Sequence, residues 1–364
     1  MVRRARSAAV IAPAGPPRAT SLVTGGSGYF GSLLVRRLVA AGHTVRVLDL
    51  NDADDHPPGV EMIVGDIRER DTVARAVAGC DIVFNNVAQV PLARDEHLLR
   101  SVNVEGTTLL LQEAQRLGVG KVVHTSSSAV FGMPTSNPVL VSTVPSPIES
   151  YGLAKLDAER ACLDAASHGL DVTIIRPRTI VGHGRLGIFG ILFEWVADGA
   201  DIFVLGAGDN RQQFIHGDDL AEVCILAAGA AGPAVFNVGT DRFGTMRESL
   251  ESLCAHAATG SRVRSIPARP AAAMMRAAAV VRLAPFAPYH WLMFSKSLGF
   301  DIDHVRDTLG WQPKWSNDEM LANSYDWFLR NRASTAQGGR SHHRTIAKQG
   351  ALRVLKLATR LLPG

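Results

Sequence analysis

Short runs of β-branched and aliphatic residues alternate with longer stretches of helical periodicity through the first half of the chain. Each short run is followed by polar or glycine-rich turn residues, and the predicted helices cover residues 30–41, 70–78, 96–117 and 151–168. Strands that alternate with helices in this way form right-handed βαβ units around a mostly parallel sheet, so we expect a doubly wound α/β fold. The predicted strands are Ser21–Thr24, Thr44–Leu48, Val60–Val64, Asp81–Phe84, Lys121–His124 and Val172–Ile175.

The alternation weakens after Arg176-Pro177, where four glycines between 182 and 190 predict loops before a helix over 187–199. A run at Val235–Val238 is expected to return to the sheet. We therefore predict a sheet domain over 19–180 and, over 181–333, a smaller substrate lobe at the carboxyl ends of the strands. Residues 1–18 are expected to form a flexible basic tail, and residues 334–364 a linker followed by a basic amphipathic helix.

Composition and charge limit the classes of protein that this chain can represent. Hydrophobic residues make up 46% of the 364 residues and charged residues 20%, which is enough apolar surface for a full core. Eleven Lys and Arg residues in 1–20 and 331–364 have no acid beside them, so removing them from the net charge of +4 leaves −7 for residues 21–330. We expect no nucleic-acid binding from a mildly acidic body.

The lack of a long apolar run and the spacing of the cysteines predict a cytoplasmic protein. No apolar run approaches the length of a membrane span, and the four cysteines lie too far apart in sequence for a metal motif, so we expect reduced, buried thiols. The basic amphipathic tail allows one exception, a peripheral contact with an anionic membrane surface.

A glycine-rich turn joins the first predicted strand to its helix. Gly25, Gly28 and Gly31 leave room for a pyrophosphate to approach the backbone N–H groups at the helix N-terminus, where Tyr29 and Phe30 begin the first turn. Asp49, at the end of the second strand, is placed to accept hydrogen bonds from the adenosine ribose. The sequence therefore predicts a Rossmann-type NAD site, and the carboxylate favours NAD over NADP.

Two later turns fit the same cofactor. Asp66 and Ile67 follow the third strand, where the aspartate side chain could meet the adenine amino group. Asn86, Val87 and Ala88 follow the fourth strand, and their backbone is expected to border the middle of the cofactor. Each aspartate or asparagine could instead serve only as a turn or cap residue.

The catalytic candidates are Tyr151, Lys155 and Ser127. Tyr151 and Lys155 are four residues apart on one face of a predicted helix, so the ammonium can favour the phenolate and lower the tyrosine pKa toward the working range. Ser127 lies 24 residues before Tyr151, at the end of the fifth strand. Its hydroxyl can hold a substrate oxygen beside that of Tyr151.

These motifs resemble those of the extended short-chain dehydrogenases/reductases, in the NAD-dependent epimerase/dehydratase family, over about residues 19–330. The matching segments are TGGSGYFG, GDI, VNVEGT, HTSSSAVFG, YGLAK, the RP of IIRPRTIVG, and FIHGDDL. The resemblance implies Tyr151 as acid/base, Lys155 as its pKa tuner and ribose ligand, and Ser127 as the residue that orients substrate. It also implies hydride transfer at a secondary alcohol or ketone, and a homodimer formed through the helices near 96–117 and 151–168. Phe131 replaces a usual tyrosine, and His183 replaces a frequent proline.

Several residues bear on the branch of the family. Ser128 and Ala129 stand where dehydratases resembling this family place an Asp-Glu pair, which argues against a dehydratase. Arg211 lies three residues before its aromatic neighbour rather than two, closer to the 3β-hydroxysteroid dehydrogenase branch, and the lobe from Ile266 to Leu298 is rich in Ala, Met and aromatic residues.

Other cues favour sugar substrates. The short gap between Ser127 and Tyr151 and the SSSAVFG motif are closer to the sugar epimerases, and either Arg185 or Arg211 could bind an anionic substrate. Our leading hypothesis is a sterol-like or other lipid-like alcohol as the substrate. The alternative is a nucleotide-sugar 4-epimerase with tightly bound NAD, and a more remote one is a non-catalytic protein that senses a dinucleotide.

Overall fold

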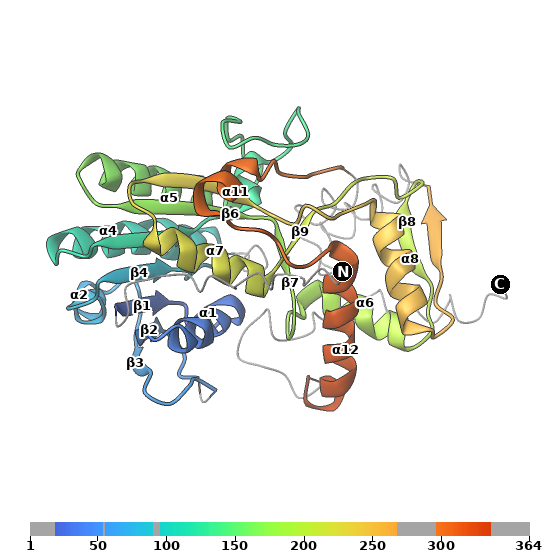
Figure 1. Cartoon of the computed structure of the whole chain (residues 1–364), viewed down its shortest axis with the longest axis horizontal. Coiled ribbons are helices and arrows are strands. Elements are labelled where there is room, and N and C mark those ends of the chain that lie inside the picture. The colour runs from blue at the N-terminus through green and yellow to red at the C-terminus, as the bar shows by residue number, and fades with distance from the viewer. Residues whose placement is uncertain (1–18, 54, 90–94, 268–295, 336–364) are drawn as a thin grey trace, which may run out of the picture.

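A computed structural model of the chain describes residues 19–53, 55–89, 95–267 and 296–335. Seven strands form one parallel sheet in the order β10-β6-β5-β4-β1-β2-β3 (Figure 1). This arrangement confirms the predicted doubly wound α/β fold. The strands of this sheet are β1 Thr20–Thr24, β2 Thr44–Asp49, β3 Glu61–Val64, β4 Ile82–Asn85, β5 Lys121–Thr125, β6 Val172–Pro177 and β10 Ala234–Val238.

Helices cover both faces of the sheet, because neighbouring residues of each strand point to opposite sides. Val23 packs in one core cluster with residues of α1, α7 and α11, whereas Leu22 packs in a second cluster with residues of α2, α4 and α5. The helices of the first face are α1 Tyr29–Ala40, α7 Gly217–Gly229 and α11 Asp303–Leu309; those of the second are α2 Arg70–Val77, α4 Thr107–Arg116 and α5 Ser150–Ser167.

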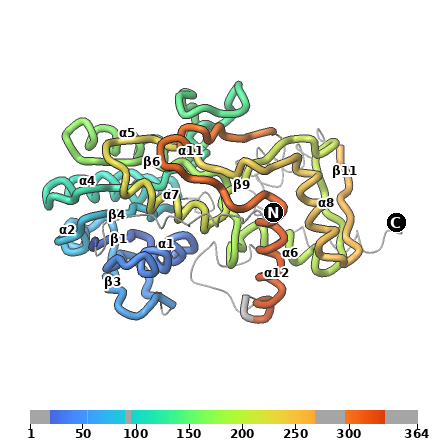
Figure 2. Tube along the Cα trace, viewed as in Figure 1, coloured from blue at the N-terminus to red at the C-terminus, as the bar shows by residue number. Residues whose placement is uncertain are grey.

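A third core cluster belongs to a smaller lobe beside the carboxyl ends of the strands (Figure 2). There β8 pairs with β11, and β7 pairs with β9. Three helices pack around these strands, and Trp195 and Phe193 of α6 lie among the buried residues. The lobe consists of β7 Thr179–Val181, α6 Gly187–Ala197, β8 Ile202–Leu205, β9 Phe214–His216, α8 Met246–Ala257, β11 Val263–Ile266 and α12 Asn317–Thr335.

The single helix predicted over 96–117 is wrong in one respect, because the structure divides it into three parts. A π-helical turn, η1 (Ser101–Gly106), separates α3 (Glu96–Arg100) from α4. Inside this turn the buried Asn103 side chain accepts a hydrogen bond from the Gln89 backbone N–H and donates one to its carbonyl oxygen. Such turns are frequent at functional sites. Here the extra residue directs Asn103 toward the segment that follows β4.

Several predictions concern residues outside the described ranges. The N-terminal tail, most of the linker and basic helix predicted over 334–364, and most of the apolar stretch from Ile266 to Leu298 belong to this group. None of the helices in the described residues is long and apolar enough to span a membrane.

Candidate active site

The glycine-rich turn between β1 and α1 is shaped by close backbone contacts. Gly25 has a φ of +68°, and a Cβ at this position would lie 2.9 Å from the Cα of Val87. A Cβ on Gly31 would overlap the Gly25 carbonyl oxygen. Gly28 is the N-cap of α1 and has no side chain to bond the first N–H groups of the helix. The turn therefore fits an anionic group held by backbone N–H donors, as the pyrophosphate of NAD requires.

Asp49 ends β2 beside this turn. One oxygen of its half-buried carboxylate accepts a hydrogen bond from the Ser27 backbone N–H at 3.1 Å, and the other accepts one from the Asn51 N–H at 3.0 Å. A carboxylate has about four acceptor positions, so these two bonds leave capacity for ribose hydroxyls. The contact with Ser27 fixes the carboxylate at the edge of the glycine-rich turn.

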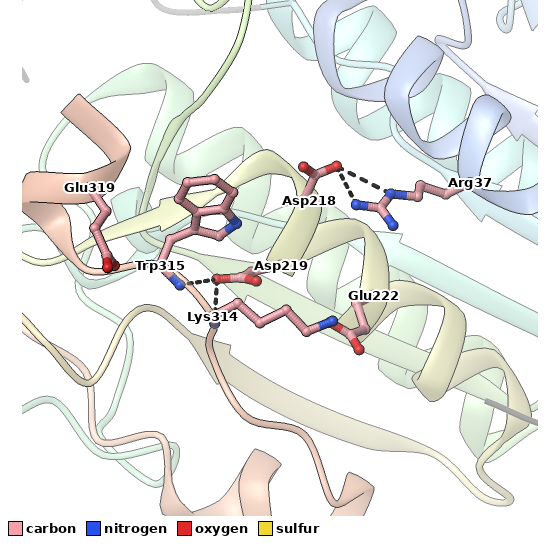
Figure 3. Close-up of a pocket in the computed structure, with 7 residues that line it drawn as sticks. All are labelled: Arg37, Asp218, Asp219, Glu222, Lys314, Trp315 and Glu319. Atoms are coloured by element: carbon pink, nitrogen blue, oxygen red, sulfur yellow. Dashed lines mark hydrogen bonds and ion pairs between the residues drawn. The ribbon is translucent and has the colours of Figure 1, made fainter. Parts of the chain in front are cut away.

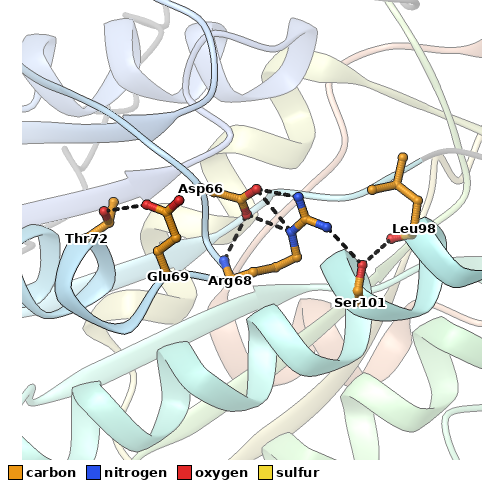
Figure 4. A network of polar contacts seen from close by, with 6 residues as sticks. All are labelled: Asp66, Arg68, Glu69, Thr72, Leu98 and Ser101. Carbon is orange, nitrogen blue, oxygen red and sulfur yellow. Dashed lines mark hydrogen bonds and ion pairs between the residues drawn. The ribbon is translucent and has the colours of Figure 1, made fainter.

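Asp66 forms an ion pair that the sequence analysis did not anticipate. Its two oxygens accept hydrogen bonds from Nε and Nη2 of Arg68, while Nη1 of Arg68 donates to the Ser101 hydroxyl at the start of η1 (Figure 4). The hydrogen bonds from Arg68 lower the pKa of the Asp66 carboxyl group. Ile67 is buried, and a Cβ on Gly106 would lie 2.6 Å from its Cγ2. The turn after β3 therefore contacts η1 twice, through the hydrogen bond of Arg68 to Ser101 and through the packing of Ile67 on Gly106.

Asn86, Val87 and Ala88 leave the end of β4 beside the glycine-rich turn. The Thr24 hydroxyl accepts from the N–H groups of Asn86 and Val87 and donates to the buried Asn85 side chain at 2.8 Å. Ala88 follows and is half-buried. These bonds join the carboxyl ends of β1 and β4, where the sequence predicts the middle of the cofactor.

Lys155 lies deep in the same region. Helix α5 is capped by Glu149, whose carboxylate accepts hydrogen bonds from the N–H groups of Tyr151 and Gly152. One turn after Tyr151, the Lys155 ammonium donates to the Thr125 carbonyl oxygen at 2.9 Å, at the end of β5. The side chain is buried, and this burial lowers the pKa of Lys155 to about 8. An ammonium with this pKa remains mainly charged at pH 7.

Three consecutive serines follow β5, and the structure distinguishes them. Ser126 is buried and donates to Glu159 at 2.5 Å, and Ser128 is also buried. Ser127 is half-buried, and its hydroxyl accepts from the Ala129 N–H at 3.2 Å, at the start of the 3-10 turn η2 (Ser128–Phe131). Of the three serines, Ser127 is therefore the one that best suits a contact with substrate.

Helix α5 packs closely on η2, which brings the Ser127 loop and the Tyr151 helix together. A Cβ on Gly152 would lie 2.5 Å from the Ala129 carbonyl oxygen and 3.0 Å from the Pro147 Cβ. The absence of a side chain at Gly152 allows this approach.

A buried ion pair stabilises the segment that carries the three serines. Two nitrogens of Arg176 in β6 donate to the carboxylate of Glu159, which also accepts the bond from Ser126. The guanidinium of Arg176 also lies over the ring of Phe131, 5.0 Å from its centroid. This network could not be predicted from the sequence, in which Arg176 stands out only as part of the RP segment of a family motif.

The two arginines predicted to bind substrate lie in different places. The guanidinium of Arg185 lies over the ring of Tyr29, 5.5 Å from its centroid, beside the first turn of α1. Arg211 is exposed, and its guanidinium lies over the ring of Phe243 and donates to the Phe243 carbonyl oxygen. Phe30, in the first turn of α1, packs against the core cluster that α1 shares with α7 and α11.

A polar pocket lies between α1, α7 and the segment that leads into α12 (Figure 3). In it, Asp218 pairs with Arg37, and Asp219 accepts hydrogen bonds from the N–H groups of Lys314 and Trp315. Burial raises the pKa of Asp219 to about 6. Behind the pocket, Trp315 stacks on the buried His216 ring at 4.4 Å, and burial lowers the pKa of His216 to about 4. These contacts attach the smaller lobe to α7.

Metal chemistry has no support among the residues that the structure describes. They contain no group of three or more His, Cys, Asp or Glu side chains placed to hold a metal ion. The four cysteines are buried with free thiols.

Comparison with known proteins identifies the class to which this fold and site belong. The profile of the NAD dependent epimerase/dehydratase family matches residues 21–239. The chain therefore belongs to this family, which confirms the predicted resemblance, an enzyme of the extended short-chain dehydrogenase/reductase type and NAD as the family's cofactor.

Three curated relatives differ in what they are named for. An uncharacterized protein, y4nG, from Sinorhizobium fredii is 49% identical over 95% of this chain and 87% of its own length. A UDP-glucose 4-epimerase from Mycolicibacterium smegmatis is 30% identical over 86% and 99%. A sterol demethylase protein B from Methylococcus capsulatus is 34% identical over 65% and 75%. Relatives thus include both a sugar-nucleotide enzyme and a sterol-modifying enzyme.

Solved structures show the same fold. A UDP-glucose 4-epimerase from Thermotoga maritima aligns with a TM-score of 0.73, at 24% identity over 86% of this chain and 99% of its own. MoeE5 in complex with UDP-glucose and NAD aligns with a TM-score of 0.69, at 25% identity over the same shares of the two chains.

Proposed function

We propose that this protein is an NAD-dependent oxidoreductase that uses Tyr151 as acid/base at a secondary alcohol or ketone. The observation that carries the proposal is the position of Lys155, whose buried ammonium lies one helical turn after Tyr151 and bonds to Thr125, two residues before Ser127. A positive charge held there favours the Tyr151 phenolate, which can then accept the proton of a substrate hydroxyl. Ser127 donates a hydrogen bond that keeps the substrate oxygen beside Tyr151.

The residues that would hold NAD are those of the glycine-rich turn and the three strand ends beside it. The N–H groups of Tyr29 and Phe30 would bind the pyrophosphate, Asp49 would accept hydrogen bonds from the adenosine ribose, and Asp66 would be the candidate for a contact with the adenine. When bound, NAD accepts or supplies the hydride of the reaction. Asp49→Ala should weaken the binding of NAD more than that of NADP, as measured by fluorescence titration. Equal losses would argue against the ribose contact.

We infer that the substrate is lipid-like. The loop that joins Ser127 to Tyr151 exposes several aliphatic side chains, with Val144 81% exposed. The guanidinium of Arg211 lies over the ring of Phe243 and donates to its carbonyl oxygen, so part of its donor capacity is used within the protein. A sterol-modifying enzyme among the relatives supports the same substrate class.

A nucleotide-sugar 4-epimerase is the second candidate function. It is favoured by the Mycolicibacterium UDP-glucose 4-epimerase, which aligns over 99% of its length with this chain. In that case the ketone would remain bound, rotate in the site and be reduced on its other face. Arg185 would then be the candidate for an anionic contact with the substrate.

The fate of NAD on purification distinguishes the two functions. A dehydrogenase has to release its reduced cofactor in each cycle, whereas an epimerase regenerates NAD and has reason to retain it. After desalting, we expect an empty site that exchanges readily and oxidation of sterols or other lipid alcohols. Stoichiometric NAD retained on the protein, with turnover of UDP-glucose, would support the epimerase instead.

Substitutions at Ser127 and Tyr151 test the catalytic assignment, and Ser126→Ala is the matched control for the serine. Ser127→Ala and Tyr151→Phe should each lower kcat by about a hundredfold or more while the NAD affinity stays near wild type. Ser126→Ala should instead lower stability, because Ser126 bonds to Glu159 inside the protein. Loss of activity in Ser126→Ala alone, or loss of NAD binding in Tyr151→Phe, would contradict the assignment.

We also propose that the enzyme is a homodimer formed through α4 and α5. Leu117, which follows α4, and Leu153 on α5 are exposed in the single chain. Leu153→Asp should convert the dimer to a monomer in light scattering. An unchanged mass would rule out this interface.

A further inference from the structure

The loop between η2 and α5, residues 132–148, differs from the rest of the surface in its charge and polarity. It contains no charged side chain, although charged residues make up 20% of the chain, so about three would be expected in a segment of this length. Among the described residues it contributes four of the ten large hydrophobic side chains that are exposed. They are Met133, Leu140, Val144 and Ile148. Figures 1 and 2 show this apolar loop projecting from the body of the protein.

The apolar loop is held firmly at its base. Val139 is fully buried, its N–H donates to the Gly299 carbonyl oxygen at 2.8 Å, and its own carbonyl accepts from the Asp301 N–H at 3.0 Å. The side chain of Asn137 accepts a further bond from the Gly299 N–H. A turn closed by Leu140 and Thr143 then begins the exposed tip. These bonds fix the backbone from Asn137 to Thr143, from which Leu140 is exposed and after which Val144 follows.

Apolar surface continues from the apolar loop onto the body of the protein. Val141 lines a groove together with Leu163 and Ala166 of α5 and with Pro233 and Val235 before and within β10. The exposed tip is thus part of a larger apolar surface.

We propose that the apolar loop inserts into the interfacial layer of a lipid membrane and docks the protein there. Charged side chains are the ones that a bilayer penalises most, and the loop has none. Its large exposed hydrophobic side chains are three aliphatic residues and a methionine, set among small uncharged polar residues. Protein-binding surfaces are instead typically anchored by aromatic residues and arginine and surrounded by a polar rim. A projecting, convex tip also suits insertion among lipids better than contact with a second folded surface.

The apolar loop lies between the proposed catalytic residues in the chain, so docking would affect where they face. It connects the segment after β5, which carries Ser127, to the start of α5, which carries Tyr151, so docking would bring both residues near the membrane. The docking itself goes beyond the proposed activity and can be tested without it.

Flotation of the full chain with vesicles of pure phosphatidylcholine tests the proposal. Because these vesicles carry no net charge, basic residues elsewhere in the chain contribute little to binding. We expect the wild type to float with the vesicles at low and high salt alike. The double variant Leu140→Asp and Val144→Asp should partition at least about tenfold less, since each buried aliphatic side chain contributes more than that factor. Leu329→Asp, which changes an equally exposed leucine of α12, is the matched control and should float like the wild type.

Each other outcome overturns the proposal. These outcomes are no flotation of the wild type, equal flotation of the double variant, and binding that requires anionic vesicles and disappears at high salt. A change of mass in light scattering of the double variant would indicate a protein partner instead. If the double variant fails to fold, Val144→Asp alone keeps the test decisive, because its side chain is the most exposed of the four.

Discussion

The buried charge of Lys155 predicts an unusual dependence of stability on pH. Its pKa is lowered from 10.5 to about 8, mainly because burial removes water from the ammonium. Each tenfold change in proton affinity corresponds to about 1.4 kcal/mol, so the charged group costs the folded protein roughly 3 kcal/mol near pH 7. Between pH 8 and 10.5 the unfolded chain binds more protons than the folded one. Stability therefore rises with pH in this window as the cost disappears.

Replacement of Lys155 by methionine should remove this dependence. The substitution eliminates the charge at similar length but leaves the Thr125 carbonyl without its donor, which costs about 1–3 kcal/mol at every pH. The two proteins should consequently have similar stability at pH 7. From pH 7 to pH 10 the wild type should gain about 2–3 kcal/mol over Lys155→Met.

Urea unfolding of the cofactor-free proteins at pH 5, 7, 8.5 and 10 measures this difference. Burial raises the pKa of the Cys162 thiol, and Lys155 lowers it, so removing Lys155 raises it further. The folded thiol therefore stays protonated through pH 10 in both proteins, and the loss of stability in alkali that this thiol causes is nearly the same in the two. The difference should stay constant from pH 5 to 7, which serves as the internal control. Parallel stability curves up to pH 10 would refute the argument that Lys155 carries a buried charge.

Three further substitutions test contacts around the site. Gly152→Ala should push α5 away from the Ala129 carbonyl oxygen and lower kcat by about a hundredfold without weakening NAD, and kinetics near wild type would contradict the close approach. Glu159→Gln leaves the buried Arg176 charge without its partner and should cost about 3–5 kcal/mol in urea unfolding, whereas a loss under 1 kcal/mol would argue against the ion pair. For Asp219, whose raised pKa of about 6 makes the folded protein hold a proton more tightly, stability falls as pH rises from 3.8 to 6. Asp219→Asn should therefore gain up to about 3 kcal/mol on the wild type across that window, and a flat difference would contradict it.

Much of the fold could be predicted from the sequence because it depends on local periodicity. The apolar runs at Thr44–Leu48 and Val172–Ile175 predicted strands within two residues of their observed ends, and the predicted helix 151–168 differs by one residue from α5. The π turn at 101–106 was not predictable in this way. It depends on a tertiary contact of Asn103 with the Gln89 backbone, which periodicity does not encode.

In the candidate site, too, the features that depend on local spacing were predictable, and those that depend on tertiary contacts were not. Two motifs could be recognised because each lies within a few consecutive residues. They are the glycines at 25, 28 and 31 and the four-residue spacing of Tyr151 and Lys155. By contrast, the pairing of Asp66 with Arg68 depends on how one side chain folds back on the other, and spacing alone did not reveal it. The roles of the arginines are the most difficult to predict. Nothing in the sequence near Arg211 indicates that its guanidinium stacks on Phe243.

One face of α5 connects the proposed chemistry to the stability of the fold. Tyr151, Lys155 and Glu159 follow one another at intervals of four residues, so they lie along the same side of the helix. Lys155 bonds to the end of β5, and Glu159 bonds to Ser126, the residue before Ser127, while it neutralises Arg176 in β6. The two strands that carry these partners are neighbours in the sheet. A shift of α5 along its axis would therefore displace Tyr151 and break the Ser126–Glu159 and Glu159–Arg176 contacts together. Such coupling favours a single position of the helix, as acid/base chemistry at a fixed distance requires.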